Sequence, residues 1–173
     1  MKKARLITTY DCPKNCEGCC NKNWKYTSAV KITSVKSLID YDEINITGGE
    51  PMLLGVGLLD LVFELINQNR DKQQNLYLYT ALADDKTIPL YKVLIRVLTG
   101  ITFTIHDEED IDNFIKLNNV LLEMNPELSL QLHVFDNLLL KFPVVDLSLW
   151  KVKSMIWIKD CPLPKDEVLY ELK

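Results

Sequence analysis

The sequence predicts an α/β protein whose sheet is mostly parallel. Short stretches of β-branched and aromatic residues recur along the chain, and amphipathic segments with a helical period separate them. Strands that alternate with helices imply parallel strands joined by right-handed crossovers. The chain has 173 residues, of which 47% are apolar and 25% charged. That length and composition suit a single globular domain over residues 1–173 with a sizeable core.

Six strands are expected from runs rich in apolar, β-branched or aromatic residues. They are predicted at residues 4–10, 43–47, 75–80, 101–105, 130–135 and 154–159. The connection before the last strand contains Pro143 and has no clear pattern. Six strand–helix units are enough for an open barrel, whereas a closed barrel of eight needs about 250 residues. A doubly wound sheet has a similar pattern, so the alternation alone leaves both architectures open.

Helices are expected between these strands. A short one is predicted at residues 34–40, and a longer one at 53–69 has Leu58, Val62 and Leu65 on one face. The segment 87–98 is also helical in pattern, with a proline near its start, where proline is tolerated.

The helix expected at residues 108–124 has the clearest boundaries. Asp107 can cap its first turn, and Asp110 in that turn favours the helix dipole. Asn125 and Pro126 end it.

Charge and hydropathy exclude several classes of function. The net charge of −4 and pI near 5.2 argue against a dedicated nucleic-acid surface. The longest apolar stretch, 53–66, contains Asp60 and Glu64 and is too short to span a membrane. The start of the chain lacks the apolar core of a signal peptide, so a cytoplasmic protein is expected. The five cysteines are then better suited to metal binding or catalysis than to disulfides.

Cys12, Cys16 and Cys19 have the spacing C-x-x-x-C-x-x-C directly after the first predicted strand. A compact loop can turn three thiolates inward at this spacing to hold three irons of a 4Fe–4S cluster. A full structural set has four cysteines, so one iron would lack a protein ligand. The alternative is a zinc site, which would need a fourth ligand brought by the fold. Cys20 is adjacent to Cys19 and poorly placed for that role, which leaves His106, His133 or Cys161.

The second motif is Gly48-Gly49-Glu50-Pro51, at the end of the strand predicted at 43–47. Paired glycines let the chain bend sharply and let a ligand approach the backbone. An ordinary turn of the same composition is the alternative. Other polar residues also lie at or just beyond the ends of predicted strands, and the carboxyl ends of parallel strands are where function gathers in such folds. They are Thr80, His106 and His133.

Together the two motifs resemble those of the radical S-adenosylmethionine (radical SAM) superfamily. The resemblance implies a partial (β/α)6 barrel in which Cys12, Cys16 and Cys19 hold the cluster and SAM binds its open iron. It also implies that Gly48, Gly49, Glu50 and Pro51 bind the amino group of SAM. Thr80, His106 and His133 are candidates to line the SAM pocket, with packing or capping as the alternative. Reductive cleavage of SAM would give a 5′-deoxyadenosyl radical that abstracts hydrogen.

Within the superfamily, the stretch 16–24 looks most like the small activating enzymes of anaerobic ribonucleotide reductase. That likeness implies a glycyl-radical enzyme as protein substrate and a flavodoxin- or ferredoxin-type electron donor. Two alternatives stay open. One is a tailoring enzyme acting on a peptide or a small heterocycle, similar to a deazapurine synthase, and the other is a non-catalytic iron–sulfur or zinc module.

Overall fold

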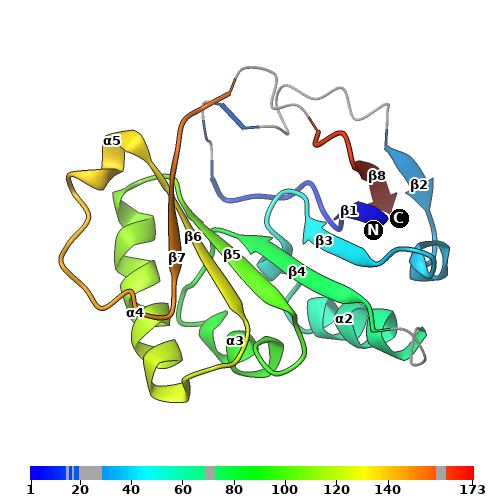
Figure 1. Cartoon of the computed structure of the whole chain (residues 1–173), viewed down its shortest axis with the longest axis horizontal. Helices are drawn as coiled ribbons and strands as arrows, with labels where there is room; N and C mark the ends of the chain where they lie inside the picture. The colour runs from blue at the N-terminus through cyan, green and yellow to red at the C-terminus, as the bar shows by residue number, and fades with distance from the viewer. Residues whose placement is uncertain (15, 17, 20–28, 69–72, 159–162) are drawn as a thin grey trace.

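Eight parallel strands form one sheet in the part of the chain that the computed structural model describes, residues 1–14, 16, 18–19, 29–68, 73–158 and 163–173 (Figure 1). Their order across the sheet is β2-β8-β1-β3-β4-β5-β6-β7. The strands are β1 (Lys3–Ile7), β2 (Val30–Ile32), β3 (Glu43–Thr47), β4 (Asn75–Thr80), β5 (Gly100–Ile105), β6 (Ser129–Phe135), β7 (Lys151–Met155) and β8 (Glu167–Leu172). Within the described residues β2 pairs only with β8 and β7 only with β6, so the sheet is open.

The prediction of an α/β protein with a parallel sheet is confirmed, but the prediction of six strands is wrong. Two strands were missed. β2 has only three residues, and charges at Glu167 and Glu171 interrupt the apolar pattern of β8. The strand predicted at 154–159 lies earlier, at Lys151–Met155, because this edge strand is exposed and carries lysines rather than an apolar run. The first strand ends at Ile7 instead of residue 10.

The helices follow the predictions with changes at their ends. α4 (Glu108–Met124) has the predicted bounds, Asp107 accepts a hydrogen bond from the backbone N of Asp110, and Asn125 ends the helix with a φ of 42°. α3 (Ile88–Leu94) is shorter than predicted. The helix predicted at 53–69 is divided, because Gly55 with a φ of 57° separates the 3-10 turn η3 (Pro51–Leu54) from α2 (Val56–Gln68). The short helices are η2 (Val35–Leu38) and α5 (Asp136–Leu139).

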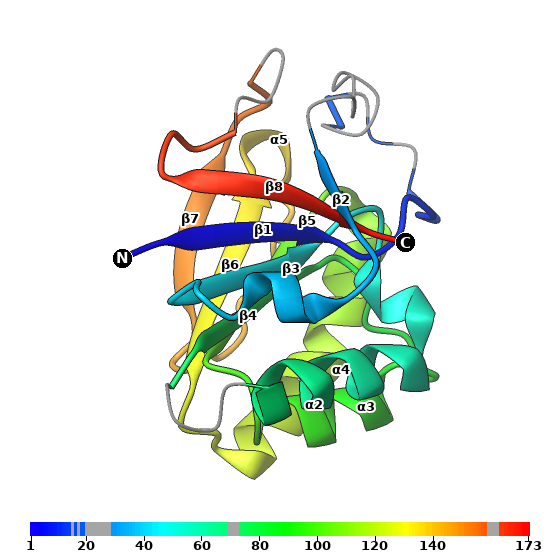
Figure 2. The ribbon, with the colours of Figure 1, turned by 90° about the vertical axis from the view of Figure 1, so that its right-hand side faces the viewer.

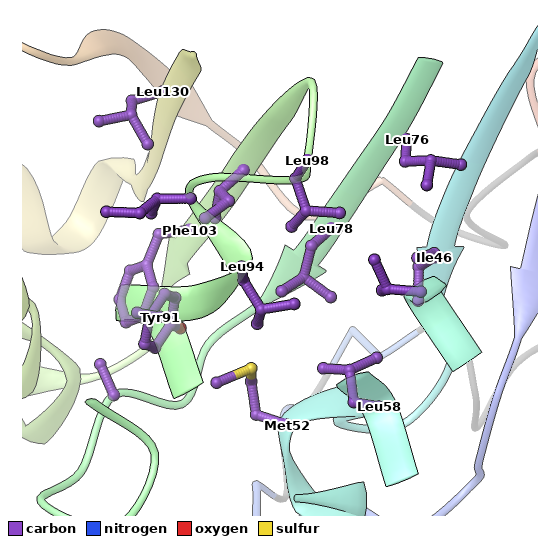
Figure 3. Close-up of a cluster of buried hydrophobic side chains, with 14 of the residues drawn as sticks. Ile46, Met52, Leu58, Leu76, Leu78, Tyr91, Leu94, Leu98, Phe103 and Leu130 are labelled. Atoms are coloured by element: carbon purple, nitrogen blue, oxygen red, sulfur yellow. The ribbon is translucent and has the colours of Figure 1, made fainter. Parts of the chain in front are cut away.

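α2, α3 and α4 lie together on one face of the sheet (Figure 2), and the core fills the space between them and the strands. In Figure 3, Ile46, Leu78 and Phe103 project from neighbouring strands toward Leu58 of α2 and Leu94 of α3. All five side chains are fully buried. Each such residue gains about 1.5–3 kcal/mol by leaving water, so this layer supplies much of the stability. Among the described residues, none of the helices combines the length and apolar character needed to cross a membrane.

The opposite face of the sheet carries a polar cluster formed by Arg5, Asn45, Tyr79 and Glu167. The guanidinium of Arg5 donates to Glu167 through Nε at 2.5 Å and lies 4.9 Å from the centre of the Tyr79 ring. The amide of Asn45 donates to Oε1 of Glu167 at 3.3 Å. Asn45 is buried, and the side chains of Arg5 and Glu167 are 19% and 7% exposed. The cluster therefore joins β8 to β1 and β3 through charge-assisted hydrogen bonds.

The Glu167→Gln substitution is expected to lower the free energy of unfolding by about 2 kcal/mol, because it leaves the largely buried Arg5 without a counter-charge. Denaturant unfolding followed by circular dichroism measures the change. Glu123→Gln, on the exposed part of α4, is the control and should change little. Equal midpoints for the Glu167 variant and the wild-type protein would show that the ion pair contributes nothing.

Candidate functional site

The two sequence motifs meet at the carboxyl edge of the sheet. The cysteine loop, defined here as residues 12–19, follows β1, and the glycine turn, Gly48–Gly49, follows β3, which is the strand paired with β1. Thr80 ends β4, and His106 follows β5 on the next strand. In Figure 1 this edge is the upper left side of the sheet, toward which β5 and β6 run and where the chain that leaves β1 rises. The parallel topology thus places the predicted residues of four strands along one edge.

The glycine turn packs directly on the backbone that leads into the cysteine loop. Gly49 N donates to Thr9 O at 2.6 Å, and Glu50 N donates to Asp11 O at 2.7 Å. A Cβ on Gly49 would lie 2.1 Å from Asp11 O, and one on Gly48, whose φ is 139°, would lie 2.3 Å from Thr9 O. Both glycines are therefore needed for the approach of the protein's own backbone, whether or not a ligand also approaches there.

Glu50 ties the glycine turn to the end of β4. It is 2% exposed, and its Oε1 accepts from Thr80 Oγ1 at 2.6 Å and from Met52 N at 3.0 Å. Its Oε2 accepts from Ala81 N at 2.8 Å. Burial raises the pKa of Glu50, and these hydrogen bonds offset part of that effect. Glu50 and Thr80 thus hold two loops together, and their contact with SAM stays a prediction.

His106 is held at the edge by its backbone and by aromatic rings. Its backbone N donates to Asp110 Oδ2 at 2.8 Å, and Nδ1 lies 3.6 Å from the same oxygen. The ring lies 5.5 Å from that of Phe135 and 5.8 Å from that of Trp157, measured between centroids. The imidazole is 21% exposed, so it stays accessible from the edge of the sheet.

His133 lies apart from this group, on β6 between Thr104 of β5 and Lys153 of β7 in the strand register. Burial lowers its pKa, and the charge of Lys153 lowers it further. The lowered pKa favours the neutral form of the His133 imidazole. β4 and β5 separate β6 from β3, the strand that leads to the glycine turn, and the place of His133 in a SAM pocket stays a prediction.

The three cysteines are near enough to influence one another. Burial, together with the charges of Cys19 and Cys12, raises the pKa of Cys16 to about 11. Burial also raises the pKa of Cys12, with smaller effects from Glu50 and Cys19. Cys19 N donates to Cys16 O at 3.3 Å, which closes a turn between these two ligand candidates. Cys20 and Cys161 lie outside the described residues.

The donor set has the chemistry of a site for a soft metal. The thiolates of Cys12 and Cys19 raise the pKa of Cys16, and a bound cation would relieve that repulsion by replacing the protons. Thiolates select iron–sulfur clusters and zinc over harder ions. Among the described residues, no three histidine, cysteine or acidic side chains are placed closely enough to hold a metal ion.

Alkylation should show the raised pKa of Cys16. In protein freed of metal, iodoacetamide at pH 8 is expected to modify Cys16 about 100-fold more slowly than free cysteine, because only the thiolate reacts. The rate should rise about tenfold per pH unit below pH 11. Mass spectrometry of the peptide containing Cys16 measures it, with N-acetylcysteine in the same tube as reference. Equal rates for the two thiols would contradict the burial of Cys16.

Two residues that sequence reasoning did not single out, Lys14 and Trp157, take part in contacts between the cysteine loop and the rest of the fold. Lys14 Nζ lies 2.8 Å from Asp110 Oδ1 and 3.0 Å from Asp107 Oδ2. Burial alone would lower the pKa of Lys14, but these carboxylates outweigh it and the pKa is raised. Trp157 stacks on Phe135 with centroids 3.9 Å apart, and a Cβ on Gly18 would lie 2.4 Å from its ring. A lone lysine and an exposed tryptophan give no pattern that predicts these contacts.

Neither a search of protein-family models nor a search of curated proteins found a match to this chain.

Proposed function

We propose that this protein is a radical SAM enzyme. In this proposal Cys12, Cys16 and Cys19 hold a 4Fe–4S cluster, and SAM binds its open iron beside the glycine turn. The observation that carries the proposal is the pair of backbone hydrogen bonds from Gly49 and Glu50 to the segment just before Cys12. They join the cysteine loop and the glycine turn into one unit at the edge of the sheet where α/β proteins place their sites.

The strand order supports the finer fold that this proposal needs. Apart from β2, each strand from β1 to β7 lies beside the next along the chain, in the order β1-β3-β4-β5-β6-β7, with α2, α3 and α4 on one side. This is the order of a partial (β/α)6 barrel, and β8 and β2 extend it beyond β1. The polar cluster of Arg5, Asn45, Tyr79 and Glu167 would then face the interior of the barrel.

The protein's own residues would bind and orient the reactants. Three thiolates hold the metal, and the glycine turn presents backbone to the amino acid end of SAM. Glu50 keeps that turn in place through Thr80 and Ala81. A bound cluster would supply the electron that cleaves SAM, and a flavodoxin- or ferredoxin-type protein would supply that electron in turn.

Electron paramagnetic resonance tests the proposal. The protein is reconstituted anaerobically with iron and sulfide, reduced with dithionite, and measured with and without SAM. A reduced 4Fe–4S signal that changes when SAM is added is expected, together with 5′-deoxyadenosine and methionine as products. A protein that binds zinc and gives no cluster signal would make the chain a structural module. A cluster that ignores SAM would point to electron transfer or sensing.

For the substrate, we propose a glycyl-radical enzyme. The sheet is open, and α2, α3 and α4 cover only the face opposite the polar cluster. This arrangement suits a protein substrate that completes the site with one of its own loops. Transfer of deuterium from the glycine of the partner protein into 5′-deoxyadenosine tests this. Transfer from a labelled peptide or heterocycle instead would make the protein a tailoring enzyme.

A further inference from the structure

Lys14 stands between Cys12 and Cys16 in the sequence, but its side chain leaves the cysteine loop and contacts the first turn of α4. Its ammonium group lies 2.8 Å from Asp110 Oδ1, 3.0 Å from Asp107 Oδ2 and 3.8 Å from Glu109 Oε2. Only 13% of the Lys14 side chain is exposed. The contact is therefore shielded from water, unlike a surface ion pair, which contributes little.

Asp110 is fixed by groups other than Lys14. Its side chain is fully buried, and its Oδ2 accepts from the backbone N of His106 at 2.8 Å. Its own backbone N donates to the capping oxygen of Asp107 at 3.0 Å. The carboxylate is thus attached both to the end of β5 and to the start of α4, and its remaining oxygen, Oδ1, faces Lys14. A loop that reaches this carboxylate is attached to the sheet itself.

We propose that Lys14 and Asp110 are a positioning pair that anchors the cysteine loop to the sheet, so that its thiols have less far to move when they bind one metal centre. This inference rests on the proposed metal site and adds what holds the loop in place. A loop that supplies three ligands loses conformational entropy when it binds metal, and a tether between the first two ligands removes part of that loss beforehand. The loop is also held by Glu50 N on Asp11 O before Cys12 and by Trp157 against Gly18 after Cys16. Lys14 supplies the contact between these two.

Cobalt binding tests the pair without requiring enzymatic activity. Metal-free, reduced protein is titrated with Co²⁺ under anaerobic conditions, and the thiolate-to-cobalt absorption band gives the affinity. The main variant is Lys14→Met combined with Asp110→Asn. Because it removes both charges together, it leaves no buried charge unpaired and changes the net charge near the thiols little. Its denaturation midpoint should stay close to that of the wild-type protein, while its affinity for Co²⁺ falls at least about tenfold.

Three other variants complete the experiment. Lys14→Arg keeps the charge and should bind Co²⁺ within about threefold of the wild-type protein. Lys116→Met removes a lysine that is 53% exposed and pairs with Asp85 on the surface, and it should change neither quantity. The Lys14→Gln side chain can still donate a hydrogen bond to Asp110 but carries no charge. If the double variant does not fold, this variant is compared with the wild-type protein in its place. It should weaken Co²⁺ binding as the double variant does.

The outcomes separate the two proposals. A wild-type protein that shows no thiolate-to-cobalt band would overturn the metal site, and the role of the pair with it. A wild-type protein that shows the band, with equal Co²⁺ affinity in the double variant and in Lys14→Gln, would overturn the positioning pair alone.

Discussion

Replacing Gly49 with alanine is expected to separate the glycine turn from the cysteine loop. The added methyl would lie 2.1 Å from Asp11 O and 2.6 Å from Tyr10 C, and these are backbone atoms that cannot turn aside as a flexible side chain can. The hydrogen bonds from Gly49 and Glu50 would be lost as the segments move apart. We expect the free energy of unfolding to fall by about 2–3 kcal/mol and reconstituted iron to be retained poorly.

Gly57→Ala is the matched control for this experiment. Gly57 lies in α2, where the nearest atom to an added Cβ is 3.9 Å away. Alanine is favoured over glycine inside a helix by up to about 1 kcal/mol, so this variant should be as stable as the wild-type protein or more so. If Gly49→Ala is as stable as Gly57→Ala and keeps its iron, the close contact between the two motifs is not required.

Replacing Cys16 with alanine is expected to abolish the cluster and the cleavage of SAM. Cys16 is the central candidate ligand, and both Cys12 and Cys19 act on the pKa of its thiol. Two remaining thiolates cannot hold a cuboidal cluster that needs three. We expect iron to fall from about four atoms per chain to less than one. Formation of 5′-deoxyadenosine should fall by more than about 100-fold, since loss of even an outer contact to a metal ligand costs 10–100-fold.

Cys20→Ala serves as the control because the neighbouring cysteine is expected to have no part in the cluster. It should retain iron and activity. The result that would overturn the choice of ligands is iron that survives Cys19→Ala and is lost in Cys20→Ala. The zinc alternative would show instead as zinc bound to the wild-type protein with no reduced cluster signal.

The sequence predicted the parts of the fold that depend on local pattern. The apolar strands β3 and β4 have the predicted bounds, and α4 was predicted to the residue because Asp107 and Asn125 mark its ends. β2 and β8 were missed because each is held by pairing with distant strands and not by a strong local signal. β8 pairs with β1 across more than 160 residues, and the Glu167 side chain that breaks its apolar pattern is the partner of Arg5.

The same distinction applies to the candidate site. Spacing alone indicated the cysteines and the glycines, and the structure places the two motifs side by side. The hydrogen bonds of Glu50 to Thr80 and Ala81 were not predictable, because they depend on where β3 and β4 end relative to each other. The contact of Lys14 with Asp110 joins residues 96 positions apart and depends on the three-dimensional path of the cysteine loop.

The position of β8 has a consequence for the order of events during synthesis. β8 lies between β1 and β2, so the two strands that flank the cysteine loop are connected through residues near the end of this sequence. While the ribosome is still making residues 167–172, β1 can already pair with β3, but β2 has no partner among the strands described. Contacts this distant along the chain form slowly. Pairing of β2 with the sheet is therefore expected to follow the synthesis of β8 and not to accompany that of the earlier strands.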